Sequence, residues 1–247
     1  MALRSFVEGA LFAEVFGEDP PRILALHGWG RRGRDFSPSL DDLEALAPDL
    51  PGFGSSPPPD EVIGAEGYAR IVAKVLPVFA EPPVVVGHSF GGRVAVCLAA
   101  QHPDRVGPLV LTGAPLVRLQ APGRPSLGYR AIRALHRKGL VSDATMESLR
   151  QRRGSADYRA ASGVMRSILV KVINESYEDQ LKVFSRPVRL LWGSEDREVP
   201  VEVARRSVEL LREGGSEVEL RVVEGVGHHL PLEAPEELRR AIKSFLA

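Results

Sequence analysis

The sequence has 247 residues but only one cysteine, Cys97, which excludes an internal disulfide and a zinc site built on cysteines. It also lacks net charge, because 32 basic side chains balance 32 acidic ones, so the overall charge indicates neither a nucleic-acid partner nor a membrane partner. A run of 18 apolar residues is missing as well, and we expect no membrane-spanning segment. A chain with one cysteine suits a reducing compartment, which predicts a cytoplasmic protein.

Residues 1–17 carry Glu8 and Glu14 and lack the apolar stretch of a signal peptide, which also favours the cytoplasm. His, Asp and Glu do not cluster at the spacing of metal ligands, and fingerprints for phosphate or dinucleotide binding do not appear. We therefore expect no metal and no cofactor. The content of 44% apolar and 26% charged residues is that of an ordinary globular protein, long enough for one domain with an insertion.

The segment from Val84 to Gly92 has the pattern of a strand that turns sharply into a helix at a serine. Three β-branched residues precede Gly87-His88-Ser89-Phe90-Gly91, and apolar residues at helical spacing follow. This pattern is typical of a nucleophile elbow, whose strained turn lifts the serine hydroxyl clear of the sheet. A glycine-rich turn whose serine only caps the helix would have the same five residues, so the segment alone leaves both readings open.

Strand and helix patterns alternate on both sides of this segment. We predict a hairpin over 3–16 and strands over 22–26, 45–48, 109–111, 187–192 and 218–223. Helices are expected over 37–46, 68–79, 199–211 and 235–246. Such an alternation predicts a parallel sheet with helices on both faces.

The alternation stops between about residues 115 and 186, where the pattern is helical throughout. We interpret this stretch as a helical cap inserted between two parts of one α/β core. The expected organisation is an N-terminal core part, a cap and a C-terminal core part over residues 1–114, 115–186 and 187–247.

Charge is shared unevenly between the predicted cap and the predicted core. The cap holds 14 Lys and Arg residues against 6 Asp and Glu residues, a net charge of +8, and the remainder carries −8. One interpretation is attraction between two domains with solvated surfaces. The other is a cationic lid that binds an anionic substrate through arginines at positions 118, 124, 130 and 166.

A serine nucleophile needs a base and an orienting carboxylate, and candidates for both follow later in the chain. Asp196 comes after a buried strand pattern, and His228 follows the last strand pattern beside a glycine. The order serine, acid, histidine is the one expected behind a nucleophile elbow. Glu195 and His229 adjoin these residues and are the competing candidates.

Taken together, these residues resemble the α/β-hydrolase-fold serine hydrolases, in particular the capped small esterases. The likeness extends over most of the chain outside the predicted cap. It rests on His27-Gly28, the loop Asp49 to Ser56, Gly87 to Gly92, Asp196, and Gly227-His228 followed by Glu233 and Pro235. The resemblance implies a three-layer fold with a mostly parallel, eight-stranded sheet, helices on both faces and an inserted helical cap. It also favours Asp196 over Glu195 and His228 over His229.

The resemblance further implies an oxyanion hole formed by the backbone N–H groups of Trp29 and Phe90. Expected substrate contacts are Trp29, His88, Phe90 and His229, whereas His27 is expected to hold its loop in place. A serine at position 89 excludes the aspartate-nucleophile relatives. A histidine at position 88, where carbon–carbon hydrolases tend to have asparagine, favours esterases.

We therefore predict hydrolysis of a small carboxylic ester, neutral or anionic, through an acyl-enzyme on Ser89 and without a cofactor. The same constellation also fits carbon–carbon hydrolases, thioesterases, a lyase of the menaquinone-pathway type, and cofactor-free perhydrolases or haloperoxidases. A ligand-binding member without turnover is the alternative from another class. No nucleic acid or membrane is expected as a partner, and the sequence specifies no oligomeric state.

Overall fold

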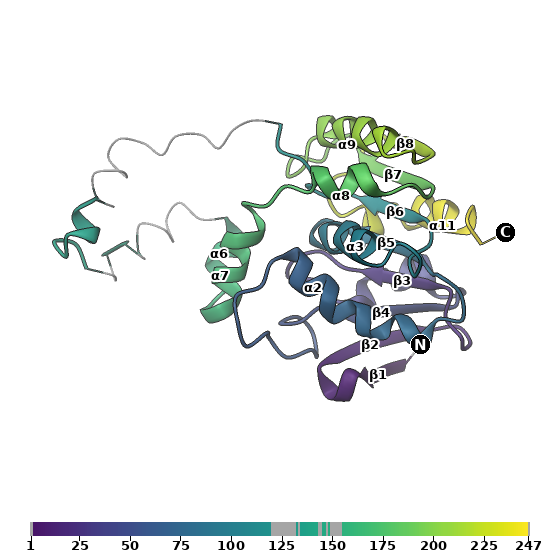
Figure 1. The fold of residues 1–247 in the computed structure, drawn as a ribbon, viewed down its shortest axis with the longest axis horizontal. Helices are drawn as coiled ribbons and strands as arrows, with labels where there is room; N and C mark the ends of the chain where they lie inside the picture. Colours follow the sequence, from purple (N-terminus) through teal and green to yellow (C-terminus); the bar gives the residue numbers. More distant parts are fainter. Residues whose placement is uncertain are drawn as a thin grey trace.

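One sheet of eight strands organises the described part of the computed structural model, which comprises residues 2–119, 132, 134–142, 145, 146, 148 and 155–246 (Figure 1). The strands are β1 (Ala2–Phe6), β2 (Leu11–Phe16), β3 (Ile23–Leu26), β4 (Ala45–Asp49), β5 (Val84–His88), β6 (Leu109–Thr112), β7 (Val188–Gly193) and β8 (Val218–Val223). Their order is β1-β2-β4-β3-β5-β6-β7-β8. β2 pairs antiparallel with β1 and β4, and all other pairs are parallel. The predicted mostly parallel, eight-stranded sheet is confirmed.

Alternate side chains of the central strands face two separate apolar cores, one on each side of the sheet. In β3, Leu24 and Leu26 belong to one core, and Ile23 and Ala25 belong to the other. The first core is closed by α2 (Ala65–Val72), α3 (Phe90–Gln101), α8 (Glu178–Val183) and α9 (Val201–Glu213). The second is closed by α1 (Ser37–Leu40), α10 (Leu230–Glu233) and α11 (Pro235–Lys243). This arrangement is the predicted three-layer α/β fold.

Several helices differ from their predicted lengths. The helix predicted over 37–46 consists of the four-residue α1, which is followed by a turn before β4 begins at Ala45. The helix predicted over 68–79 starts earlier, as α2, and continues as the 3-10 helix η3 (Ala73–Val78). Pro77 lies in η3 and has no N–H group to donate to an α-helical turn. Two further 3-10 helices are η1 (Val7–Gly9) and η2 (Gly33–Phe36).

The described residues between β6 and β7 contain no strand and include α6 (Ala156–Ala160), α7 (Gly163–Val172) and α8. Figure 1 shows α6 and α7 beside the sheet layers, whereas α8 lies between α3 and α9 with Leu181 fully buried. The cap boundaries at 115 and 186 stay predictions. Of the four arginines predicted to bind an anion, Arg124 and Arg130 lie outside the described residues.

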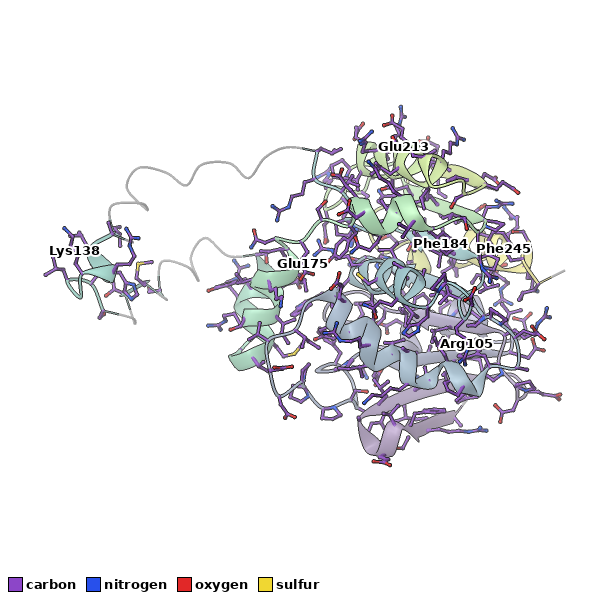
Figure 2. The ribbon with its side chains drawn as sticks, in the orientation of Figure 1. Arg105, Lys138, Glu175, Phe184, Glu213 and Phe245 are labelled. Carbon is purple, nitrogen blue, oxygen red and sulfur yellow. The ribbon has the colours of Figure 1, made fainter. Side chains whose placement is uncertain are left out.

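Glu175 joins the segment after α7 to the core (Figure 2). Its Oε2 atom accepts hydrogen bonds from the backbone N–H of Ala65, at the start of α2, and from the Tyr177 hydroxyl, at 3.1 and 2.8 Å. Nearby, the buried Arg93 of α3 donates to the carbonyl of Val172 at the end of α7. These bonds hold the end of α7 and the residues after it against α2 and α3. Among the described helices, none is long and apolar enough to cross a membrane.

Candidate active site

Ser89 lies between β5 and α3 in a backbone conformation that few side chains adopt, with φ of 50° and ψ of −114°. A Cβ atom at Gly87 would lie 2.6 Å from the Cα of Gly92, and one at Gly91 would lie 2.0 Å from the Leu26 carbonyl oxygen. Only glycine therefore fits at these two positions. The Ser89 side chain makes no capping hydrogen bond to α3, so the alternative of a serine that only caps the helix is wrong.

Three side chains from three strand ends form one continuous hydrogen-bonded chain. His228 Nε2 lies 3.0 Å from Ser89 Oγ, and His228 Nδ1 lies 2.9 Å from Asp196 Oδ2. Asp196 follows β7 and His228 follows β8, and the carboxyl ends of these parallel strands meet at the same edge of the sheet as Ser89. Glu195 is exposed and is not part of this chain of bonds. The structure thus brings together the three residues expected to be catalytic.

The Asp196 carboxylate is held on both oxygens. Its Oδ1 atom accepts hydrogen bonds from the backbone N–H groups of Glu198 and Val199, at 2.9 and 2.8 Å. Only 1% of the side chain is exposed. A carboxylate fixed in this way leaves Oδ2 aimed at Nδ1 of His228 and sets which ring nitrogen faces the serine.

Several carboxylates surround His228, and they change its protonation equilibrium. Burial alone lowers the pKa of His228, but the hydrogen bond and charge of Asp196, with smaller contributions from Glu198 and Glu233, raise the pKa above its usual 6.5. Glu198 Oε2 lies 3.6 Å from Nε2, the nitrogen that also contacts Ser89. The site therefore favours the protonated imidazolium that must form when the serine gives up its proton.

Glu233 holds the turn that carries His228. Its two carboxylate oxygens accept the backbone N–H groups of Gly227 and His229, at 2.7 and 3.1 Å, on either side of the histidine. In the sequence, Glu233 belongs to the family pattern that carries the resemblance, whereas Glu198 is not among the candidate residues. The spacing of Glu198, two residues after the acid, is the one signal that could have drawn attention to it.

The loop after β3 lies against the serine turn. A Cβ atom at Gly28 would lie 3.3 Å from the Cβ of Ser89, so the backbone of Gly28, the residue before Trp29, passes close to the serine. Phe90, the other residue predicted to donate to an oxyanion, is the first residue of α3, where N–H groups have no acceptor within the helix. Phe90 thus directly follows Ser89, Trp29 follows the glycine that approaches it, and their role as donors stays a prediction.

His27 holds this loop, as expected. Its Nε2 atom accepts the backbone N–H of Leu50 at 2.8 Å, so Nδ1 carries the proton and donates to the Gly28 carbonyl at 2.7 Å. Burial is the main cause that lowers the pKa of His27 to about 4. The imidazole is therefore neutral near pH 7 and acts as a structural link between two loops.

Four residues were predicted to contact substrate, and the structure gives them different surroundings. Phe90 is buried and makes edge contacts with Trp29 and Tyr68, at centroid distances of 5.4 and 4.9 Å. His88 is buried too, and its Nδ1 atom bonds to Oγ1 and the carbonyl of Thr112, at 2.9 and 3.2 Å. His229 is exposed, with its ring 5.5 Å from that of His228. Trp29 is half-buried, and all four substrate contacts stay predictions.

Two of the four arginines predicted to bind an anion are bonded within their own segment. Arg118 donates to the Ile173 carbonyl and to Asn174 Oδ1, at 2.9 and 3.3 Å. Arg166 donates from Nε to the Ala161 carbonyl at 2.7 Å. Over residues 2–119, 132–148 where described, and 155–246, no group of three or more His, Cys, Asp or Glu side chains is arranged to hold a metal ion.

Comparison with known proteins places this fold and this site in a family context. A family model described as the alpha/beta hydrolase family matches residues 23–241. The pimeloyl-[acyl-carrier protein] methyl ester esterase of Chromobacterium violaceum is 38% identical over 105 residues, 41% of this chain and 39% of that protein. The 2-hydroxy-6-oxononadienedioate/2-hydroxy-6-oxononatrienedioate hydrolase of Burkholderia vietnamiensis is 27% identical over 91% of this chain and 86% of that protein.

Among solved structures, the thioesterase domain from the curacin biosynthetic pathway superposes with a TM-score of 0.70. That alignment covers 98% of both chains at 18% identity, so the likeness concerns the fold. The chain spans less than half of the length of two of the curated relatives that it matches.

Proposed function

The chain belongs to the alpha/beta hydrolase family, and we propose that it is a serine hydrolase that cleaves a small carboxylic ester. In this proposal Ser89 is the nucleophile, His228 the general base and acid, and Asp196 the carboxylate that orients the histidine. The observation that carries the proposal is the hydrogen-bonded chain from Asp196 through His228 to Ser89, at 2.9 and 3.0 Å. A hydroxyl at neutral pH is a weak nucleophile, and this chain supplies the base that it needs.

The reaction follows from the atoms of this chain. Ser89 Oγ attacks the ester carbonyl carbon while Nε2 of His228 takes the hydroxyl proton. The imidazolium then passes that proton to the leaving oxygen, the carbon–oxygen bond breaks, and an acyl group remains on Ser89. A water molecule, deprotonated by the same nitrogen, attacks the acyl-enzyme and releases the acid. No cofactor enters these steps.

We propose that the backbone N–H groups of Trp29 and Phe90 donate to the oxyanion formed in each step. The close approach of Gly28, the residue before Trp29, to Ser89 and the position of Phe90 at the start of α3 support this role. Each donor of an oxyanion hole typically lowers the barrier by roughly 3–4 kcal/mol. Because these are backbone groups, their test is the geometry of a bound transition-state analogue rather than a side-chain substitution.

The segment between β6 and β7 is proposed to cover the site as a cap. Met165 of α7 supports this placement, because its sulfur lies 3.9 Å from the Tyr68 hydroxyl, and the Tyr68 ring packs against Phe90, the residue after Ser89. Glu198 also bears on substrate choice, because its Oε2 atom lies 3.6 Å from His228 Nε2. A substrate that presents an anion to this side of the imidazole would be repelled by this carboxylate.

The experiment that tests the proposed function is hydrolysis of a series of p-nitrophenyl esters from acetate to octanoate. The wild-type protein should release p-nitrophenol with a kcat/KM that depends on acyl length, and Ser89→Ala should lose this activity while its thermal unfolding stays cooperative. A wild-type protein with no activity on any ester, but with binding of acyl ligands, would instead identify a non-catalytic member of the family.

Carbon–carbon hydrolysis is the second candidate, because the relative named for 2-hydroxy-6-oxononadienedioate aligns along 91% of this chain. His88 precedes the serine where that class tends to have asparagine, and this favours ester chemistry. A direct comparison of a 2-hydroxy-6-oxo-dienedioate with the best p-nitrophenyl ester decides between them. A kcat/KM at least tenfold higher on the dienedioate would reverse the order of the two candidates.

A further inference from the structure

Three carboxylates lie around His228, and they differ in whether their oxygens are already bonded. Both oxygens of Asp196 are engaged, one by the backbone N–H groups of Glu198 and Val199 and the other by His228. Both oxygens of Glu233 accept backbone N–H groups of the turn that carries His228. Among the described residues, the carboxylate of Glu198 contacts only His228, with Oε2 3.6 Å from Nε2. Of the three, Glu198 is therefore the one that can bind a further group.

The backbone of Glu198 is fixed, whereas its side chain is open to solvent. Its N–H group donates to Asp196 Oδ1 at 2.9 Å, which holds the residue in the loop that carries the catalytic carboxylate. The side chain is 64% exposed, so a ligand can reach it. Glu198 thus presents an accessible negative charge next to Nε2 of His228, the nitrogen that also faces Ser89.

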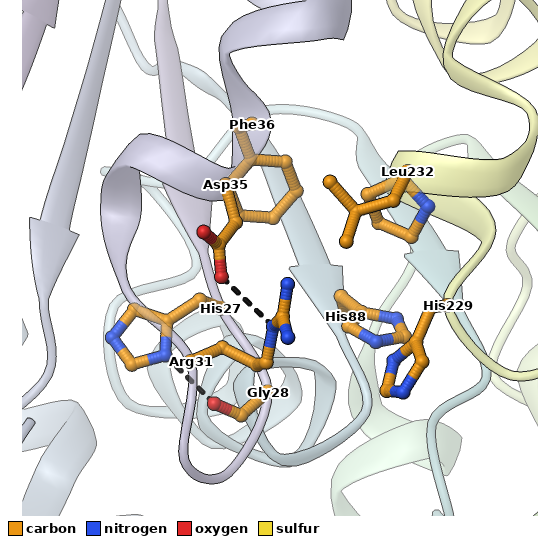
Figure 3. Close-up of a pocket in the computed structure, with 9 residues that line it drawn as sticks. His27, Gly28, Arg31, Asp35, Phe36, His88, His229 and Leu232 are labelled. Atoms are coloured by element: carbon orange, nitrogen blue, oxygen red, sulfur yellow. Dashed lines mark hydrogen bonds and ion pairs between the residues drawn. The ribbon is translucent and has the colours of Figure 1, made fainter.

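This charge lacks a cationic partner at the start of the reaction. His228 must be neutral to accept the serine proton, and in that state it offers Glu198 no positive charge. Among the described residues, no ion pair joins Glu198 to a lysine or an arginine. Arg31, in the loop after β3, is paired with Asp35 at 2.8 Å (Figure 3). A positive charge on the substrate would therefore find an unneutralised carboxylate.

The proposed reaction brings the leaving oxygen close to this carboxylate. Nε2 of His228 hands its proton to that oxygen, so the two atoms approach to about 3 Å. Because Nε2 lies 3.6 Å from Glu198 Oε2, the leaving oxygen comes no further than roughly 7 Å from that atom. Two carbon atoms between the leaving oxygen and an ammonium nitrogen are enough to span most of this distance. The geometry thus points to the alcohol half of the ester.

We propose that Glu198 selects esters whose leaving alcohol carries a positive charge, in the form of an ammonium group about two carbons from the ester oxygen. The inference rests on the proposed function, since it assigns a substrate class to the same site. Attraction between a carboxylate and an ammonium group needs no fixed direction, which suits an exposed side chain. The ammonium group takes no part in the proton transfer, and the alcohol leaves with its charge unchanged.

The test compares acetylcholine with 3,3-dimethylbutyl acetate, a neutral ester of the same shape. The measured quantity is the ratio of their kcat/KM values, in which intrinsic reactivity and any change in His228 cancel between protein variants. Glu198→Gln should lower this ratio about three- to fivefold, the effect of an exposed ion pair. Glu195→Gln removes an equal charge from an exposed side chain of the same loop and should leave the ratio within about 1.5-fold. An unchanged ratio in Glu198→Gln, or an equal fall in both variants, would overturn the proposal.

Ionic strength gives a second readout, which a purely structural role of Glu198 would not move. Salt weakens the attraction between exposed charges, so the wild-type ratio should fall between about 20 and 500 mM NaCl. In Glu198→Gln the ratio should stay nearly constant over the same range. An equal dependence on salt in both proteins would contradict a role for the charge of Glu198.

A second pair of substrates distinguishes the two halves of the ester. The p-nitrophenyl ester of 4-(trimethylammonio)butyrate carries its charge on the acyl side, and p-nitrophenyl 5,5-dimethylhexanoate is its neutral counterpart. Their kcat/KM ratio should be the same in the wild type and in Glu198→Gln. A ratio that falls in Glu198→Gln would show that the carboxylate acts on the acyl half, against the proposal.

Failure of this inference is distinguishable from failure of the proposed function. Hydrolysis of p-nitrophenyl acetate without measurable hydrolysis of acetylcholine would refute the inference and leave the proposed function standing. If the wild type hydrolyses no ester, the proposed function is wrong, and titration with choline, followed by NMR, still examines Glu198. A dissociation constant that rises at least threefold in Glu198→Gln and not in Glu195→Gln supports a cation site. Equal constants for the three proteins contradict it.

Discussion

The turn that carries His228 and the strand end that carries His88 both bury an imidazole, and their rings lie 5.1 Å apart. At His228 the partner is the carboxylate of Asp196, which raises the pKa against the effect of burial. At His88 the partners are the hydroxyl and carbonyl of Thr112, and burial lowers the pKa well below its usual value. The charge of the hydrogen-bond partner, more than burial, therefore decides which of the two histidines can take up a proton.

Substitution of the two histidines should change kcat/KM by very different amounts, and this is the largest effect that we expect. His228→Ala should lower kcat/KM on p-nitrophenyl esters by ~10⁴-fold, because the base and the acid of both steps are lost. His88→Asn keeps a donor for Thr112 and should lower kcat/KM by less than tenfold, measured in the same assay. His229→Ala should change KM more than kcat. A large loss of kcat in His229→Ala with near-normal activity in His228→Ala would reverse the assignment.

Removal of the negative charge of Asp196, the partner that distinguishes His228 from His88, should have the next largest effect. Asp196→Asn should lower kcat/KM by ~10³- to 10⁴-fold and shift the acid limb of its pH profile to lower pH, because the pKa of His228 loses its main support. The acid limb moves in this direction because His228 must be neutral to act as a base, so activity rises as the pH increases through its pKa. In the wild type the midpoint should lie above 6.5. Glu195→Gln, at an exposed position, should match the wild type within twofold.

His27, which donates to a backbone carbonyl, should affect the pH dependence of protein stability rather than the rate of hydrolysis. With a pKa of about 4 when folded and 6.5 when unfolded, His27 binds more protons in the unfolded chain between these values. The free energy of unfolding should therefore fall by roughly 2–3 kcal/mol from this residue between pH 7 and pH 4.5. His27→Gln can still accept from Leu50, and urea titrations at both pH values should show a smaller fall. An identical fall in both proteins would contradict the account.

Substitution of Glu233, which holds the turn that carries His228, should have the smallest effect. Glu233→Gln cannot accept both backbone N–H groups on charged oxygens, and the histidine should lose part of its alignment. We expect kcat to fall about tenfold with little change in KM, because small misplacement of a catalytic group mainly affects the chemical step. Glu224→Gln, an exposed neighbour in the same loop, is the control. A fall in thermal stability without any change in kcat would make Glu233 a purely structural residue.

Much of the fold followed from the sequence, because local patterns decide it. β-branched runs bounded by Gly and Pro marked the strands, and the strand ends placed Ser89, Asp196 and His228 at one edge of the sheet. The family pattern already favoured Asp196 and His228 over their neighbours, and both neighbours, Glu195 and His229, are exposed in the structure. Helix lengths did not follow from the pattern: α1 ends at Leu40 in a turn, and the helix after α2 is a 3-10 helix that contains Pro77.

The charges around the site could not be predicted in the same way. Charge counting directed attention to Arg118 and Arg166, but both donate to backbone carbonyls of their own segment. Glu198 gains its significance from a turn that meets His228 only in the folded chain. A net charge per segment carries no information about the partner that each guanidinium finds there.

The most direct test of the central claim is covalent labelling with a fluorophosphonate, followed by mass spectrometric mapping of the adduct. The serine activated by His228 should react, so a single adduct should map to the peptide that contains Ser89. His228→Ala should label far more slowly, and Ser89→Ala should not label. An adduct on another residue, or labelling that persists unchanged in Ser89→Ala, would contradict the assignment of Ser89 as the nucleophile.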